Sequence, residues 1–184
     1  MKVTKTKFPG LLVIEPKVFA DDRGYFLEAF NEEKFSAYGA AFRSVQENES
    51  KSLYGVVRGL HFQKGDFAQA KRVRVIFGRV WDVALDLRTD SPTFGEVFYV
   101  ELSGENKKQA IIPAGFAHGF SVLSEECVFT YSCSAQYSPD HEGGILLDDP
   151  DLNIDWKIPM EDRIISDRDR KWKNFKETTS NFTL

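Results

Sequence analysis

The sequence predicts an all-β protein, either a sandwich or a barrel, formed as one domain over residues 1–184. Short runs of β-favouring residues recur along the chain, and residues that favour turns separate them. No repeat, low-complexity tract or linker divides the 184 residues, a length that supports one domain with a substantial core but not two. The aromatic residues, 16 Phe, 6 Tyr and 3 Trp, are expected mainly to fill that core.

The N-terminal part of the chain contains two expected strands and one short helix. One β-favouring run covers 11–14, and a second, 24–30, follows a turn at Asp21-Asp22-Arg23. A short helix is expected over 31–38, because Asn31 is a good N-cap residue and two glutamates follow it in the first turn.

The middle of the chain predicts a β-hairpin and then further strands. Residues 72–77 and 80–87 are joined by Gly78-Arg79, which suits a tight turn. In the second strand, Asp82 and Asp86 lie opposite an apolar face, which consists of Trp81, Val83, Leu85 and Leu87. Further strands are expected at 95–102, 109–112, 119–123, 127–133 and 145–147. The charge-rich tail, 162–175, is expected to be helical or irregular.

The charge balance restricts the possible partners. The chain has 24 basic and 28 acidic residues, a net charge of −4, which argues against binding to duplex nucleic acid but not against a local site for a phosphorylated small molecule. No apolar stretch approaches the length of a membrane span, and residues 1–5 lack the apolar core of a signal peptide. The protein is therefore expected to be soluble and cytoplasmic.

The two cysteines, Cys127 and Cys133, lie six positions apart in one strand-like run. If that run is one extended strand, their Cα atoms are too far apart for a disulfide bond. Both are expected to be buried thiols in a reducing compartment.

Several reactive side chains occur in strand-like apolar runs, where an imidazole is costly to bury unless a partner or a task justifies it. Alternation predicts which side chains share a face. The shared faces are Lys71 with Val73 and Val75, His118 with Phe116 and Phe120, Tyr131 with Phe129 and Cys133, and His61 with Val57 and Gly59. If these faces point inward, a histidine, a lysine and a tyrosine form an acid/base pocket. The alternative is that each is structural: a hydrogen-bonded core histidine, an edge-strand lysine and a core tyrosine.

A functional metal ion is not expected. The spacing Pro113-x-Gly115-x-x-His118 resembles the second half of a cupin metal motif, but no second histidine lies two residues from His61. The third histidine, His141, lies in a turn-like segment and is a poor ligand candidate, whereas metal sites need several converging ligands.

Two arginines are candidates for binding phosphate. Arg23 and Arg58 each precede a glycine, which would let an anion or a ring approach the backbone closely. The alternative is that both are solvated surface residues. The chain has no glycine-rich dinucleotide fingerprint and no P-loop.

Together, these segments resemble the dTDP-4-dehydrorhamnose 3,5-epimerase family. The matching motifs run in order from Phe8 to Asp169, and the most specific pair is Arg58-Gly59-Leu60-His61 with Gly115-Phe116-Ala117-His118-Gly119-Phe120. The resemblance implies a cupin-like jelly-roll β-sandwich with short peripheral helices, a homodimer, and no metal or organic cofactor. It also implies an epimerase that inverts C3 and C5 of a nucleotide-linked 4-keto-6-deoxyhexose.

The resemblance also implies catalytic roles. His61 matches the catalytic base, and Asp169, in Ser166-Asp167-Arg168-Asp169, matches the carboxylate that orients it, with Asp167 as a weaker candidate. Lys71 matches the lysine that stabilises the enolate oxygen, and Tyr131 matches the tyrosine that returns a proton to the opposite face.

Substrate binding follows from the same resemblance. Arg23, Phe26 and Glu28 are expected to reach the nucleotide in the neighbouring subunit, with Phe26 stacked on the base. The other expected contacts are Gln46, Asn48 and Arg58 to the base and diphosphate, His118 near the sugar or phosphate, and Tyr137 at the pocket border.

Two departures from the family pattern concern the strands. Arg72 stands where family members often have leucine, and alternation predicts that it faces away from the pocket. Leu147 stands where the family usually has tryptophan, and Trp172 is a candidate to compensate.

Three alternatives to double epimerisation of a dTDP sugar remain at this point. The chain could act at C3 alone or C5 alone, or on a CDP-linked sugar. It could be a metal-dependent cupin enzyme such as a dioxygenase, or a sugar-nucleotide binder without turnover.

Overall fold

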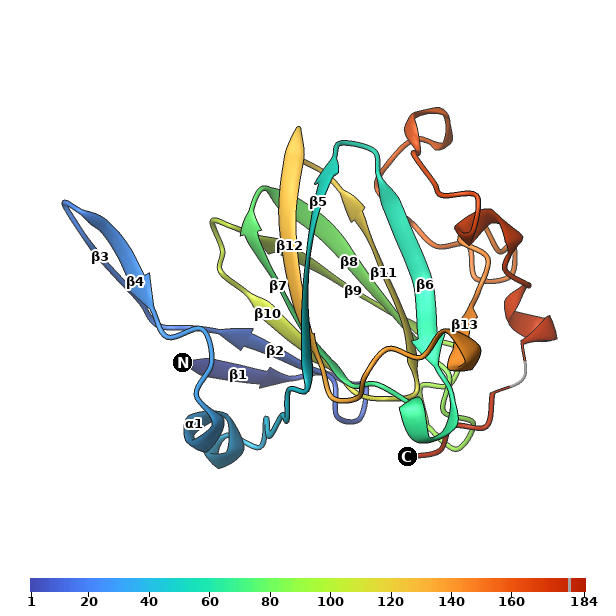
Figure 1. Ribbon diagram of the computed structural model, residues 1–184, viewed down its shortest axis with the longest axis horizontal. Coiled ribbons are helices and arrows are strands. Elements are labelled where there is room, and N and C mark those ends of the chain that lie inside the picture. Colours follow the sequence, from blue (N-terminus) through green and yellow to red (C-terminus); the bar gives the residue numbers. More distant parts are fainter. Residues whose placement is uncertain (179) are drawn as a thin grey trace.

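The computed structural model describes residues 1–178 and 180–184 and confirms the predicted all-β sandwich (Figure 1). Every pairing within its sheets is antiparallel. One sheet has the order β1 (Lys2–Lys5), β2 (Leu12–Glu15), β10 (Gln109–Ile112), β7 (Lys71–Phe77), β12 (Glu126–Cys133), β5 (Gln46–Leu53). The other has the order β13 (Glu142–Gly144), β6 (Val57–Gln63), β11 (Phe116–Val122), β8 (Arg79–Asp86), β9 (Val97–Ser103).

The connectivity of β5 to β12 is that of a jelly roll. The first of these eight strands pairs with the last, β5 with β12, and the pairing continues inward as β6 with β11, β7 with β10 and β8 with β9. Successive strands from β5 to β8 therefore alternate between the two sheets, and so do β9 to β12. The hairpin predicted from 72–77 and 80–87 is wrong, because the corresponding strands, β7 and β8, lie in different sheets and do not pair. Residues far apart in sequence are brought face to face across the space between the sheets.

A separate hairpin and a short helix precede the jelly roll. The hairpin, β3 (Val18–Asp21) and β4 (Gly24–Leu27), projects away from the sheets (Figure 1). The predicted helix is α1 (Glu32–Ala37), and the side chain of its N-cap, Asn31, accepts a hydrogen bond from the backbone N–H of Lys34 at 3.0 Å. Its Phe35 packs on the six-stranded sheet. Among the described residues, no helix is long and apolar enough to cross a membrane.

Two layers of core lie on the two faces of the five-stranded sheet. The inner layer, between the sheets, includes Val80, Ala84 and Phe116, while Val83 and Leu85 belong to an outer layer beneath the C-terminal segment. Both faces of β8 are therefore buried, and the face that carries Asp82 and Asp86 points into the molecule, with neither residue exposed.

The C-terminal segment, predicted to be helical or irregular, is irregular and follows the outside of the five-stranded sheet (Figure 1). It contains 3-10 turns at Met160–Asp162, Asp169–Lys171 and Phe175–Glu177. The strand expected at 145–147 was misplaced: pairing with β6 involves β13, at Glu142–Gly144, and Ile145 makes only an isolated bridge. Cys127 and Cys133 both lie in β12 as buried, unpaired thiols, as predicted.

Candidate functional site

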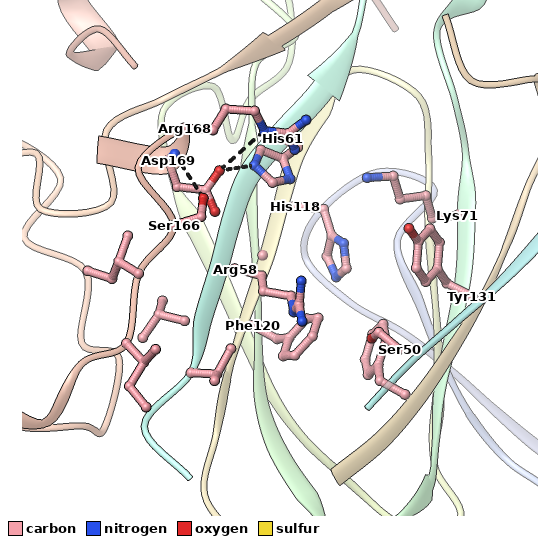
Figure 2. Close-up of a pocket in the computed structure, with 16 residues that line it drawn as sticks. Ser50, Arg58, His61, Lys71, His118, Phe120, Tyr131, Ser166, Arg168 and Asp169 are labelled. Carbon is pink, nitrogen blue, oxygen red and sulfur yellow. Dashed lines mark hydrogen bonds and ion pairs between the residues drawn. The ribbon is translucent and has the colours of Figure 1, made fainter. Parts of the chain in front are cut away.

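A cavity of about 580 Å³ lies between the two sheets (Figure 2). Side chains from β6 and β11 line it on one side, side chains from β7 and β12 line the other, and the segment 164–169 of the tail closes its edge. A smaller pocket of about 300 Å³ adjoins it and shares His61, Lys71, Tyr131 and Arg168 with it. Six of the twelve predicted site residues line the larger cavity: Arg58, His61, Lys71, His118, Tyr131 and Asp169.

His61 reaches the cavity because β6 contains an irregularity. His61 pairs with His118, but Arg58 pairs with Phe120, so β6 has one extra residue opposite β11. The predicted common face of His61 with Val57 and Gly59 is therefore wrong. His61 and Arg58 line the cavity together, while Val57 packs mainly in the outer core layer and only borders the cavity.

Asp169 lies against His61. Its Oδ1 accepts a hydrogen bond from the His61 Nε2 at 2.6 Å, and its backbone N–H donates to Ser166 Oγ at 3.1 Å. The Asp169 side chain is 4% exposed and that of His61 is 22% exposed. Burial alone would raise the pKa of Asp169, but the hydrogen bond from His61 and the nearby positive charge of Arg168 hold it below its usual value. Asp167, the weaker candidate, is exposed.

The bond to Asp169 determines which nitrogen of His61 is free. A carboxylate can only accept, so Nε2 carries the proton, and in the neutral ring Nδ1 keeps its lone pair. The indole of Trp172 lies edge-on to this imidazole, with 6.3 Å between ring centroids. His61 is therefore a partly exposed imidazole that is oriented by Asp169 and has one nitrogen free to act as a base.

Lys71 and Tyr131 line the same cavity from the six-stranded sheet, across from His61 in Figure 2. Burial raises the pKa of the Tyr131 phenol, so the hydroxyl stays protonated at neutral pH. Burial lowers the pKa of Lys71, opposed by the attraction of nearby acidic groups. The attracting groups are Cys133, Asp82 and Glu142, and burial raises the pKa of the Cys133 thiol.

His118 has a carboxylate partner that sequence reasoning missed. Its Nε2 donates to Oδ2 of Asp82 at 2.9 Å, and Asp82 is fully buried, with no described partner for Oδ1. The ring of His118 also stacks on Phe129. The available signal was the position of Asp82, which is in phase with the apolar interior residues Val80 and Ala84 of β8.

The smaller pocket is polar and contains three more predicted residues. The amide of Gln46 donates to Asn48 Oδ1 at 2.9 Å, and Gln46 Oε1 accepts from the backbone N–H of Tyr137 at 2.8 Å. The Tyr137 hydroxyl is 3.3 Å from Glu142 Oε2. These groups offer amide and hydroxyl partners to a planar polar ligand.

Two further charged residues at this pocket were not predicted. Arg168 donates through Nη1 to Glu142 Oε2 at 3.0 Å, and both side chains line the smaller pocket. Their signal was weak, since each lies in a charged segment without strand periodicity. Arg58 donates to Ser52 Oγ at 3.1 and 3.2 Å and remains exposed, so two guanidinium groups lie beside the cavity.

Three predicted residues lie outside both pockets of this chain. Arg23 and Phe26 are on the projecting hairpin, and Glu28 follows it directly. The Phe26 side chain is 68% exposed. Arg23 pairs with Asp21 at 2.6 Å, and Glu28 pairs with Lys34 at 2.9 Å.

Leu147, which lies in a turn after β13, packs against a tryptophan from further along the chain. It is buried in the outer core layer together with Trp156, whose indole N–H donates to the Leu147 carbonyl at 2.9 Å. Trp172, the candidate to compensate, instead lies over Gly144, where an added Cβ would fall 2.4 Å from its ring, and beside His61.

The arrangement can move protons on two sides of one bound molecule. The base candidate is on one sheet, the protonated phenol and the lysine are on the other, and arginines lie at the edge. Within residues 1–178 and 180–184, no group of three or more His, Cys, Asp or Glu side chains is placed to hold a metal ion.

Comparison with known proteins agrees with this geometry. Residues 5–177 match the family model described as dTDP-4-dehydrorhamnose 3,5-epimerase. The chain is 52% identical, over 94% of each sequence, to the dTDP-4-dehydrorhamnose 3,5-epimerase of Methanothermobacter thermautotrophicus. The crystal structure of the enzyme of that name from Elizabethkingia anophelis superimposes with a TM-score of 0.92 and 53% identity, covering 97% of this chain and 98% of that one. The dTDP-6-deoxy-D-glucose-3,5-epimerase of Legionella pneumophila, solved in complex with dTDP-4-keto-L-rhamnose, has a TM-score of 0.91 and 44% identity, covering 97% and 94%.

Proposed function

This chain belongs to the dTDP-4-dehydrorhamnose 3,5-epimerase family, and on that premise we propose that it inverts C3 and C5 of dTDP-4-keto-6-deoxyglucose to give dTDP-4-keto-L-rhamnose. One observation carries the proposal: His61 with Asp169, and Tyr131 with Lys71, face one cavity from opposite sheets. An inversion needs a base on one face of the sugar and an acid on the other. A single domain over residues 1–184 carries this activity.

His61 is the base in this mechanism. The C4 ketone acidifies the hydrogens on C3 and C5, and the neutral imidazole removes one of them through Nδ1. Asp169 keeps the other nitrogen protonated and stabilises the imidazolium that forms. The carbon–hydrogen electron pair becomes an enolate with its charge on the C4 oxygen.

Lys71 stabilises that oxygen. A partly buried ammonium interacts with a developing oxyanion more strongly than it would in water, and Lys71 is partly buried. The carboxylates of Asp82 and Glu142 oppose the effect of burial on the pKa of Lys71 and so favour its charged form.

Tyr131 completes the inversion by donating its phenolic proton to the opposite face of the same carbon. The raised pKa of Tyr131 supports this role, because an acid must hold its proton until it is needed. After one inversion His61 has gained a proton and Tyr131 has lost one, so proton exchange with water restores both before the second inversion.

The nucleotide binds along the edge of the cavity. Gln46, Asn48 and Tyr137 line the smaller pocket and suit the base, whose amide and carbonyl groups they can match. Arg58 suits the diphosphate because guanidinium forms paired hydrogen bonds with phosphate oxygens, and Arg168 lies close enough to help. His118, held by Asp82, contacts the sugar or the adjacent phosphate.

A second copy of the chain supplies Arg23, Phe26 and Glu28 in a homodimer. The exposed, largely apolar hairpin supports this, since an isolated two-stranded hairpin is marginally stable in water. Four of its side chains are between 42% and 68% exposed: Val18, Phe19, Tyr25 and Phe26. Phe26 stacks on the base bound in the neighbouring subunit.

The reaction uses no metal ion or organic cofactor, because the substrate's own ketone accepts the electron pair. The enzyme acts in the cytoplasm, where the two free thiols remain reduced.

Incubation with dTDP-4-keto-6-deoxyglucose in D₂O, followed by proton NMR, tests the proposal. We expect deuterium at both C3 and C5 and the L-rhamno product. Label at only one carbon would indicate a C3-only or C5-only epimerase. Faster turnover of the CDP-linked sugar would show that the natural substrate carries CDP and not dTDP. Loss of activity on chelation, with stoichiometric iron in the protein, would favour a metal-dependent enzyme. Binding without any exchange would favour a sugar-nucleotide binder.

A further inference from the structure

Arg72 carries a buried charge that forms no ion pair with an acidic side chain among the described residues, although the charge of Glu47 attracts it. It lies on β7 and is 8% exposed. Its hydrogen bonds all go to neutral groups: Nη1 donates to the carbonyl of Ala29 at 3.3 Å and to Gln109 Oε1 at 3.0 Å, and Nη2 donates to Ser132 Oγ at 3.1 Å. Its Nε is buried without a partner in the described part of the chain.

Such an arrangement is costly. Burial lowers the pKa of Arg72, yet guanidinium stays charged in proteins, so the desolvation penalty is not relieved by proton loss. A leucine would fill the same position without that penalty. We therefore look for the role of Arg72 in the groups to which its guanidinium donates hydrogen bonds.

Arg72 holds the segment that joins the projecting hairpin to α1. The Ala29 carbonyl accepts from Arg72 and also from the Gln109 side chain at 2.9 Å, and Gln109 is 1% exposed. The guanidinium lies over the ring of Phe30, 4.8 Å from its centroid, and Phe30 packs edge-on against Phe35 of α1 at 4.9 Å. We call Arg72, Gln109, Ala29 and Phe30 the hairpin clamp.

We propose that Arg72 is a positioning residue, which fixes the root of the β3–β4 hairpin and thereby the direction in which Phe26 is presented to the second copy's pocket. This inference rests on the proposed function, in which that hairpin acts on the neighbouring subunit. Phe26 lies three residues from Ala29, or about 10 Å along an extended chain. A rotation of about 10° at the clamp would move its ring by about 2 Å, enough to disturb stacking on a base.

A direct effect on the neighbouring Lys71 is the competing explanation. The two residues are adjacent on β7, but their side chains lie on opposite faces of the sheet: Lys71 lines the cavity and Arg72 contacts the hairpin root. An experiment must therefore distinguish an effect on the partner's pocket from an effect on the same chain's pocket.

The first measurement is the steady-state kinetics of Arg72→Leu with dTDP-4-keto-6-deoxyglucose. We expect KM to rise about tenfold with kcat within about twofold, because base stacking contributes to ground-state and transition-state binding alike. Arg72→Lys, which keeps a donor for Ala29, should restore part of the affinity. Arg43→Leu, at an exposed arginine in the loop after α1, is the control and should leave both constants unchanged.

Mixed dimers decide between the two explanations, with His61→Ala marking an inactive pocket. When Arg72→Leu and His61→Ala are in one chain and the partner is wild type, the single active pocket receives the altered hairpin, and we expect the raised KM. When the two substitutions are in different chains, the active pocket receives an intact hairpin, and we expect the wild-type KM. The two species are purified by different affinity tags on the two chains.

The reverse pattern would place the effect in the same chain, through Lys71, and would overturn the inference. An unchanged KM in Arg72→Leu would also overturn it. If Arg72→Leu does not fold, Gln109→Leu is used instead, because it removes the other donor to the Ala29 carbonyl. KM of the mixed dimers must then rise only when the active pocket receives the hairpin of the Gln109→Leu chain. A wild-type protein that exchanges deuterium as a monomer would refute the hairpin exchange while leaving the epimerase proposal intact.

Discussion

Replacing Asp169 by asparagine tests the proposed role of His61 as a base oriented by this carboxylate. Asparagine has nearly the same shape, and its carbonyl can still accept the Nε2 proton of His61, so the substitution removes the charge and keeps the orientation. What is lost is the stabilisation of the imidazolium that forms when the substrate's proton is taken. The expected result is a fall in kcat with little change in KM.

The size of the fall follows from the geometry. The 2.6 Å hydrogen bond joins a carboxylate that is 4% exposed to an imidazole that is 22% exposed, so solvent screens it little. A hydrogen bond to a charged group contributes about 1.5–3 kcal/mol. At about 1.4 kcal/mol for each factor of ten, kcat should fall roughly 10- to 150-fold. Asp169→Ala, which also releases the ring, should lose more.

The assay is deuterium exchange at C3 and C5 in D₂O, measured at saturating substrate. Asp167→Asn is the matched control: the same chemical change, two residues away, at an exposed carboxylate, should leave kcat unchanged. Wild-type kcat in Asp169→Asn would refute the assignment of His61 as a base oriented by this carboxylate. An equal fall in the two variants would point to a general change of charge in the segment.

Three other substitutions or treatments have defined outcomes. Tyr131→Phe should reduce the rate of inversion by about 10²-fold or more, while deuterium still enters the substrate with retention of configuration. NMR distinguishes the two products, and inversion at the wild-type rate would show that Tyr131 is not the proton donor. Asp82→Asn removes a carboxylate that raises the pKa of Lys71, so the fall of kcat at alkaline pH should begin at a lower pH. An unchanged kcat–pH profile would contradict the proposal that Lys71 must be charged. Burial raises the pKa of Cys127 to about 11, so a disulfide reagent at about pH 8 should modify it only after unfolding, and rapid modification of the native protein would show that the thiol is accessible.

Alternation along single strands predicted part of the site. Lys71, His118 and Tyr131 all line the cavity, because β7, β11 and β12 have regular alternation at those positions. The fold class was also accessible, since turn residues between short apolar runs are typical of sandwiches.

The prediction failed where periodicity breaks. One extra residue in β6 rotates His61 out of phase with Val57, and a sequence pattern alone cannot locate such a bulge. β5 was missed because its polar sequence, Gln46–Leu53, lacks a continuous apolar face. The burial of Asp82 was missed because the opposite face of β8 is apolar and looks like the only buried face. That face is covered by the irregular C-terminal segment, which no periodic pattern in the sequence reveals.

The sandwich architecture explains why this site can invert a carbon centre. Packed sheets lie about 10 Å apart, so a sugar ring between them has one face toward each sheet. The jelly-roll pairing puts β6 and β12 in different sheets, so His61 and Tyr131 line the cavity from opposite sides, as the proposed mechanism requires. A base and an acid on the same sheet would exchange the hydrogen and return it to the face it left. The stereochemical outcome thus depends on which sheet each strand joins, a property of the topology that no single strand of the sequence contains.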